Sequence, residues 1–101
     1  MKETVAHARP PMPKVNLSGA FIRRTNLRGA ILRGANLARA DMSHADLRDV
    51  DFEGANLDGT ILIGADLRGA RNLTVEQIDA AMIDRETRLP DYLDRVASKT
   101  L

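Results

Sequence analysis

Residues 15–69 read VNLSG AFIRR TNLRG AILRG ANLAR ADMSH ADLRD VDFEG ANLDG TILIG ADLRG, a five-residue phrase repeated eleven times without a break. The third position is apolar in every pentad, the first is small or β-branched, and all seven glycines of the chain occupy the fifth. A short fixed period is evidence about the whole fold and outweighs local propensity. The third-position residues, which we expect to form the core, are Leu17, Ile22, Leu27, Leu32, Leu37, Met42, Leu47, Phe52, Leu57, Leu62 and Leu67.

A period of five fits neither a helix nor a flat strand. A helix turns every 3.6 residues, so apolar residues five apart would drift around its surface. A flat strand alternates every two residues and would place successive third positions on opposite faces. The period fits a short extended segment ending in a corner, with positions one and three pointing inward and positions two and four outward. Glycine at position five favours the corner because it accepts unusual backbone angles.

Several pentads share the order Ala, Asn or Asp, Leu, as at 35–37, 45–48, 55–57 and 65–69. This pattern resembles the pentapeptide-repeat family, whose fold is a right-handed quadrilateral β-helix. The resemblance implies an all-β solenoid of just under three coils, each made of four pentads. Seven residues depart from the family's pattern without changing the expected fold: Phe21, Ile31 and Ile61 at position two, and Arg24, Arg39, His44 and Asp49 at position five.

A short helical cap is expected after the last pentad. Thr74 and Gln77 have the spacing of a capping box, and Leu73 with Ile78 that of a hydrophobic staple. These signals predict a helix over 75–83 that covers the last coil, because the ends of solenoids need caps. The helix would present Val75, Ile78, Ala81 and Met82.

A second short helix is expected over 91–98, after Pro90 has ended the first, and it could cap this chain or a neighbour. Three prolines, at 10, 11 and 13, argue against a helix near the start. That segment is an extended tail or a strap over the open first coil, with Met12 at the centre of a degenerate pentad. The expected organisation is a tail over 1–14, a β-helix over 15–72 and a cap over 73–101.

Composition excludes several classes of function. The chain of 101 residues has no cysteine, so disulfides and thiol chemistry are absent. No apolar run would cross a membrane and no leader pattern is visible, so the cytoplasm is the expected compartment. Ser43, His44 and Asp46 resemble a fragment of a catalytic triad, but neighbouring side chains on an extended segment diverge. We expect no enzyme activity, no metal and no cofactor, because side chains fill the interior.

Charge is polarised along the chain. Residues 1–40 contain eight Lys or Arg and one acid, whereas residues 41–66 contain seven acids and one Arg. The basic end is either a docking patch for an acidic partner or a solvated surface that balances the acidic coil. In a four-sided coil Arg28, Arg48 and Arg68 would stack, with Asp46 and Asp66 beside them. The candidate partner-binding arginines are Arg23, Arg24, Arg28 and Arg33.

The second side of the coil is expected to expose apolar residues. Phe21, Ile61 and Ile63 would all face outward there and are the apolar members of the candidate partner-binding set. Either the C-terminal segment folds back over Ile61 and Ile63, which is the simpler arrangement, or a partner subunit covers them.

Three functions are compatible with the sequence. The first is a rigid protein-interaction module that binds an unidentified protein, or a second copy of itself, through a flat side or an end. The second is implied by the family resemblance: some pentapeptide-repeat proteins imitate duplex DNA and protect or inhibit type II topoisomerases. The third and weakest is direct contact between nucleic acid and the basic end, which predicts salt-sensitive binding.

Overall fold

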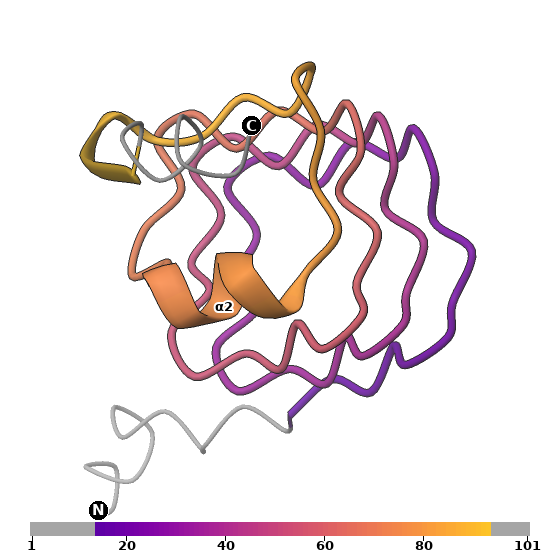
Figure 1. Cartoon of the computed structure of the whole chain (residues 1–101). Helices are drawn as coiled ribbons and strands as arrows, with labels where there is room; N and C mark the ends of the chain where they lie inside the picture. The colour runs from indigo at the N-terminus through magenta and orange to yellow at the C-terminus, as the bar shows by residue number, and fades with distance from the viewer. Residues whose placement is uncertain (1–13, 94–101) are drawn as a thin grey trace, which may run out of the picture.

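The chain winds into a four-sided coil. The computed structural model describes residues 14–93, and its coils stack one on the next (Figure 1). Ten isolated parallel β-bridges join successive coils: eight link second positions, and the last two link Ile61 to Met82 and Asp66 to Arg88. The bridged residues are twenty apart up to Asp51 and Arg71, so four pentads close each turn. Side one contains 15–19, 35–39 and 55–59, and sides two, three and four follow in steps of five residues. The predicted alignment of Asn26, Asp46 and Asp66 is confirmed.

Every fifth position turns the chain with a left-handed backbone. The φ angles at these eleven corners lie between 56° and 76°, including those of Arg24, Arg39, His44 and Asp49. Ten of the corners carry a hydrogen bond in which a first-position N–H donates to the preceding third-position carbonyl, as Ala20 does to Leu17 at 3.0 Å. Positive φ at the third residue is what a type II turn requires. The corner prediction is therefore confirmed, even where glycine is absent.

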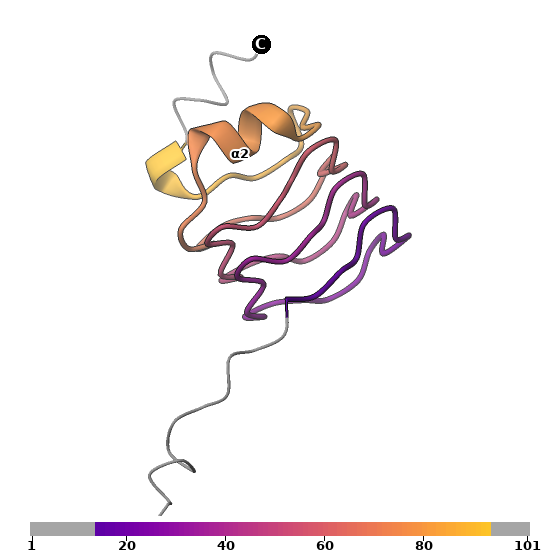
Figure 2. The ribbon, with the colours of Figure 1, turned by 90° about the horizontal axis from the view of Figure 1, so that it is seen from below.

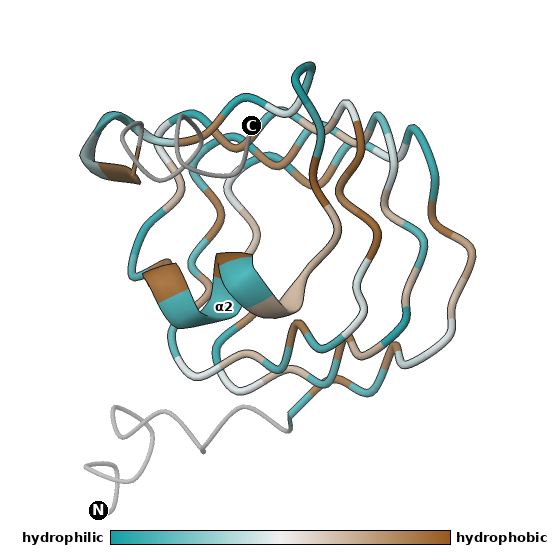
Figure 3. Ribbon diagram, in the orientation of Figure 1, coloured by the Kyte–Doolittle hydropathy of each residue, from teal (hydrophilic) through white to brown (hydrophobic). Residues whose placement is uncertain are grey.

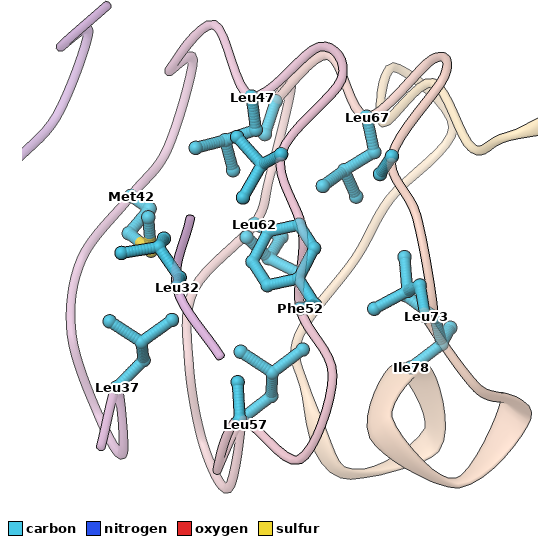
Figure 4. Close-up of a cluster of buried hydrophobic side chains, with 14 of the residues drawn as sticks. Leu32, Leu37, Met42, Leu47, Phe52, Leu57, Leu62, Leu67, Leu73 and Ile78 are labelled. Carbon is cyan, nitrogen blue, oxygen red and sulfur yellow. The ribbon is translucent and has the colours of Figure 1, made fainter. Parts of the chain in front are cut away.

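Third-position side chains fill the middle of the coil. Residues from Leu32 to Leu67 at this position are buried in one cluster (Figure 4). The first-position alanines from Ala35 to Ala70 belong to the same cluster. Leu17, Ile22 and Leu27 are only partly buried, because no described coil covers the N-terminal side of the first one. Apolar segments alternate with polar ones along each coil (Figure 3). Residues 1–13, on which the tail-or-strap alternative depends, lie outside the described residues.

The outward positions are less solvated than expected. Each of the eight Asn and Asp residues at position two accepts a hydrogen bond from the backbone N–H two residues later, as Asn16 Oδ1 does from Ser18 at 3.1 Å. These side chains cap their own turns. The expectation that positions two and four face water is wrong for Asp51, Ala38 and Ser43, which are buried against the neighbouring coils.

A short helix lies across the end of the last coil (Figure 2). Helix α2 (Val75–Ala80) has the predicted capping box between Thr74 and Gln77. The amide of Gln77 also donates to the carbonyls of Phe52 and Ala55 at 2.9 and 3.0 Å, which fastens the helix to the coil beneath it. No helix of the described residues 14–93 is long and apolar enough to span a membrane.

The helix ends three residues earlier than the sequence predicts. Ala81 is extended, with φ −95° and ψ 169°, and Met82 then pairs with Ile61 as a further β-bridge. The predicted helix over 75–83 is wrong at its C-terminal end because ladder hydrogen bonds to the coil replace helical ones. Val75 and Met82, expected to plug the core, are exposed, whereas Ile78 is buried.

The described part of the chain then continues along the third side as far as a short 3₁₀ helix. Arg88 bridges Asp66, and η1 (Asp91–Leu93) follows. The Tyr92 hydroxyl donates to the Ala70 carbonyl at 2.7 Å and accepts from the Leu73 N–H at 3.2 Å. Within the expected helix over 91–98, only residues 91–93 are described, and Val96 lies outside them.

Corner side chains lean over glycines of the following coil. A Cβ at Gly59 would lie 3.3 Å from Arg39 Cγ, and a Cβ at Gly69 would collide with the Asp49 carboxylate. A Cβ at Gly29, in the same column as Gly69, would meet nothing within 4 Å. Gly29 and Gly69 have φ of 76° and 75°, so they form a matched pair.

We expect Gly69→Ala to destabilise the protein more than Gly29→Ala does. Both changes place a side chain in the left-handed region, at a cost of about 1–2 kcal/mol. Only Gly69→Ala also displaces Asp49 from Arg28, which we expect to add about 0.5–1 kcal/mol for an exposed ion pair. Urea unfolding of both variants measures the difference, and it should vanish in an Asp49→Ala background. Equal destabilisation of the two single variants would contradict the stacking account.

Candidate protein-interaction face

Five of the seven candidate partner-binding residues share one side of the coil. The second side, defined here as residues 20–24, 40–44 and 60–64, carries Phe21, Arg23, Arg24, Ile61 and Ile63. The bridges between positions 21, 41 and 61 place its three rungs in register. Arg28 lies on the third side and Arg33 on the fourth, so the structure does not bring these two to the same face.

Phe21 is the most exposed large apolar residue of the described chain. Its relative exposure is 87%, compared with 49% for Ile31 on the fourth side. Asn or Asp at position two would bond the N–H two residues later, and phenylalanine cannot. The sequence thus forgoes a turn-stabilising hydrogen bond at this position and buries little of the ring within its own chain.

The polar centre of the second side is satisfied internally. Ser43 donates from its hydroxyl to Asp41 Oδ1 at 2.6 Å, and its backbone N–H donates to the same oxygen at 3.1 Å. The hydroxyl bond is the main reason that the pKa of the Asp41 carboxyl lies below its ordinary value. Arg23 Nε donates to Ser43 Oγ at 3.0 Å and lies 3.8 Å from Asp41 Oδ2. These groups can therefore be covered without leaving a carboxylate or hydroxyl unpartnered.

Met82 adds a fourth rung to the second side, beyond Phe21, Asp41 and Ile61, whereas the sequence predicts that it covers the core. It bridges Ile61 and is 52% exposed, whereas Ile61 and Ile63 are half-buried. The described part of the C-terminal segment thus pairs with Ile61 through its backbone and leaves Phe21 and Met82 exposed. No pentad pattern marks Met82, because α2 shifts the register from twenty residues to twenty-one.

Arginines of the first coil pair with acids of the second. Arg28 Nε donates to Asp49 Oδ2 at 3.3 Å, and Arg33 forms ion pairs with Asp51 and Glu53. Arg24 makes no ion pair with another described residue. Three of the four arginines of the first coil, Arg23, Arg28 and Arg33, are therefore paired with acids of the neighbouring coil.

Asp51 joins three coils. Its side chain is 2% exposed and accepts hydrogen bonds from Asn72 Nδ2 at 2.9 Å, from Arg33 Nε and from the Glu53 N–H at 3.1 Å. The Asn72 bond, followed by the Arg33 bond, lowers the pKa of Asp51 to about 2. No sequence pattern distinguishes Asp51 from the other second-position acids, because its burial depends on Arg33 and Asn72 from adjacent coils.

The arginine column of the third side is neutralised as the sequence predicts. Arg48 Nη2 lies 2.8 Å from Asp46 Oδ2, and Arg68 Nη2 lies 2.6 Å from Asp66 Oδ2. The hydrogen bond from Arg48 is the main cause that lowers the pKa of Asp46 to about 2. This side is therefore an internally paired surface.

The structure does not assemble the candidate triad fragment. The Ser43 hydroxyl bonds Asp41 and Asp46 pairs with Arg48, so the triad fragment is not assembled around His44. Between residues 14 and 93, no group of three His, Asp or Glu side chains is placed to hold a metal. A surface depression of about 790 Å³ lies between the end of the coil and η1, lined by Arg68, Gly69, Ala70, Arg71, Asn72, Pro90, Asp91 and Tyr92.

Comparisons with known proteins agree on the fold. The family model for pentapeptide repeats matches residues 14–49 and 35–71. A pentapeptide-repeat protein, Rfr23 of the cyanobacterium Cyanothece 51142, is 28% identical over 77% of this chain, with a TM-score of 0.67. Two trypsin-treated variants of QnrB1, described as a plasmid-mediated fluoroquinolone resistance protein, are 18% identical with TM-scores of 0.66 and 0.68 over 84% and 88% of this chain.

These solved structures are larger than this chain. The match covers 52% of the Rfr23 chain and 40% and 42% of the two QnrB1 chains. No curated protein sequence matches this chain closely. The likeness to QnrB1 shows the fold alone.

We expect stability to fall in acid as Asp46 and Asp51 become protonated. Because folding lowers the pKa of each group from about 4 to about 2, their stabilisation is complete above pH 4 and is lost as the pH falls toward 2. Urea unfolding at pH 7, 4, 3 and 2 measures the loss. Asp51→Asn should lower stability at pH 7 and flatten the acid dependence, whereas Asp58→Asn, at an exposed position, should do neither. An unchanged acid dependence in Asp51→Asn would contradict this assignment.

Proposed function

The chain belongs to the pentapeptide-repeat family, and from this premise we propose that it is a non-enzymatic protein-interaction module whose second side binds a partner protein. The observation that carries the proposal is Phe21, an aromatic side chain 87% exposed on a flat, regular face. Aromatic residues, Met and Arg are enriched at the buried centres of protein interfaces. The second side, extended by Met82 as a fourth rung, offers all three kinds in Phe21, Met82 and Arg23.

The composition of the face is better explained by binding than by folding. At position two, Asn and Asp cap their own turns, and Phe21 gives up that bond. Covering an exposed phenylalanine with a partner stabilises the complex by about 1.5–3 kcal/mol. A residue that contributes little within its own chain but offers this much to a partner fits an interface.

The backbone of the face is already ordered. We propose that nearly three coils, closed at the C-terminal end by the helical cap, hold the rungs of the second side at their ladder spacing. Ile22 and Met42 are fixed by hydrogen bonds to the next coil at 2.9 Å each. A preorganised surface loses little conformational entropy on binding, so a modest contact area suffices for specificity.

The basic end supports this proposal more weakly. Arg23, Arg28 and Arg33 are paired with acids of the second coil, which reduces their attraction for phosphates. These pairings therefore favour protein binding over nucleic-acid binding at the basic end. Arg23 and Arg24 remain beside Phe21, where they would flank an interface and favour a partner with some acidic character.

We expect Phe21→Asp to abolish retention of the natural partner, whereas Ile31→Asp leaves it intact. Both changes replace an exposed apolar residue at position two with a residue that can cap its turn, so both should fold equally well. Immobilised wild type and variants are incubated with lysate of the source organism, and the retained proteins are compared. Equal thermal unfolding of the two variants is the control. A partner retained equally by Phe21→Asp would contradict the assignment of the face.

Modulation of a type II topoisomerase is the alternative function. The acidic band of the second coil resembles the charge of a DNA mimic, but Asp41, Asp49 and Asp51 are paired with arginines of the first coil. QnrB1, a fluoroquinolone resistance protein, shares the fold at low identity, which lends this alternative no residue-level support.

We expect no effect on DNA supercoiling by gyrase, with or without a fluoroquinolone, at a large molar excess of this protein. Pairing of the acidic residues removes the continuous negative surface that mimicry of duplex DNA needs. Inhibition or drug protection in that assay would favour the alternative over the interaction module.

A further inference from the structure

We propose that a second copy of this chain occupies the second side, running antiparallel, so that Phe21 of each copy contacts Met82 of the other. The inference rests on the proposed function and names the partner. It follows from the order of residues along the face and from the distribution of charge between the two ends of the coil.

The two most exposed apolar residues of the face lie at its opposite ends. The bridges run from Phe21 through Asp41 and Ile61 to Met82, which separates Phe21 and Met82 by three rungs, or about 14 Å. A twofold axis that lies in the plane between the two copies, perpendicular to the coil axis and midway along the face, exchanges these ends. In such an isologous contact both Phe21–Met82 pairs form at once. Thioether sulfur and aromatic rings also attract one another beyond their burial.

Charge favours the antiparallel direction. On the face itself, the first rung carries Arg23 and Arg24 and no acid. At the fourth rung Asp84 follows Met82, and its Oδ1 accepts a hydrogen bond from the Gly64 N–H at 3.1 Å, in the corner column that also contains Arg24. An antiparallel pair places Arg23 and Arg24 of each copy beside Asp84 of the other. A parallel pair would place basic beside basic and acidic beside acidic, and like charges facing across an interface disfavour association.

The centre of the face tolerates coverage by a second copy. The axis sets Asp41 of one copy against Ile61 of the other. Asp41 already accepts two hydrogen bonds from Ser43 and lies 3.8 Å from Arg23 Nε. Asp41 Oδ1 thus keeps both hydrogen bonds when water is excluded, and Arg23 supplies an opposite charge near Oδ2, which reduces the cost of covering this carboxylate.

The size of the face makes the pair weak. Four rungs extend over about 19 Å and one side of the coil over about 13 Å, which gives a few hundred Å² per copy. Stable interfaces bury about 800 Å² per partner. We therefore expect association in the high micromolar to millimolar range, with dissociation on dilution.

Cysteine cross-linking tests both the pairing and its direction, because the chain has no cysteine of its own. Phe21→Cys and Met82→Cys variants are mixed at about 0.5 mM, a concentration within the weak-association range expected for a small interface, and oxidised. The proposal predicts a mixed disulfide dimer well above the homodimers of either variant alone. A mixture of Ile31→Cys and Val75→Cys, two exposed positions away from the second side, measures random collision.

Sedimentation of the unmodified chain over a concentration series provides a second measurement that needs no variant. We expect the weight-average mass to rise toward that of a dimer, and Phe21→Asp to remain monomeric. Homodimers of Phe21→Cys in place of the mixed product would overturn the antiparallel pair. A strict monomer at millimolar concentration, or cross-linking no greater than that of the control mixture, would overturn self-association. If self-association fails but retention of proteins from the lysate still depends on Phe21, the proposed function stands. If neither self-association nor Phe21-dependent retention is observed, the proposed function is overturned as well.

Discussion

The left-handed corner at every fifth residue is the constraint on which the rest of the structure depends. It turns the chain after each short extended segment, so that four segments close a coil of twenty residues. Because each turn has the same length, second positions always meet second positions in the next coil, and the ladder bonds repeat at 2.6–3.1 Å. Four of the corners lack glycine and still adopt the same φ, which shows that the ladder on both sides imposes the angle. The strain of a non-glycine corner is offset by the regular pairing that flanks it.

Because the register is strict, each side chain lies against the same position of the next coil. Identical positions stack about 4.8 Å apart, so a bulky corner residue needs space in the next coil and a charged residue needs an opposite charge there. Gly59, Gly64 and Gly69 supply the space beneath Arg39, His44 and Asp49. The acids of the second coil supply the charge for the arginines of the first. Three of the four arginines of the first coil are thus paired internally, which reduces the charge polarity that is apparent in the sequence. A linear count of charges cannot reveal this, because the paired residues are separated by about twenty positions.

The pentad predicts the coil and its core well, because each prediction depends on residues within one repeat or on the same position of the next. The corners at Arg24 and Asp49, the burial of Leu47 and Leu67, and the capping box at Thr74 are all local in this sense. Features set by competition between distant groups could not be predicted. Helix α2 ends at Ala80 because Met82 gains a ladder partner in Ile61. Asp51 is buried because Arg33 and Asn72 close over it, and both contacts depend on side chains of other coils.

The candidate face also depends partly on the repeat and partly on contacts between residues far apart in the sequence. The sequence identifies Phe21 as an exception at position two, and the twenty-residue closure places it on the side that also carries Ile61. How far the second side extends along the coil, however, is decided by the cap. If α2 continued to residue 83, Met82 would lie on a helix and the column would end at Ile61. Because the helix stops after six residues and the chain resumes β-pairing, the segment that seals the core also adds a fourth rung to the second side. The cap and the candidate face are therefore coupled in this chain, since the residue that forms the fourth rung is positioned by the same bridge that closes the last coil.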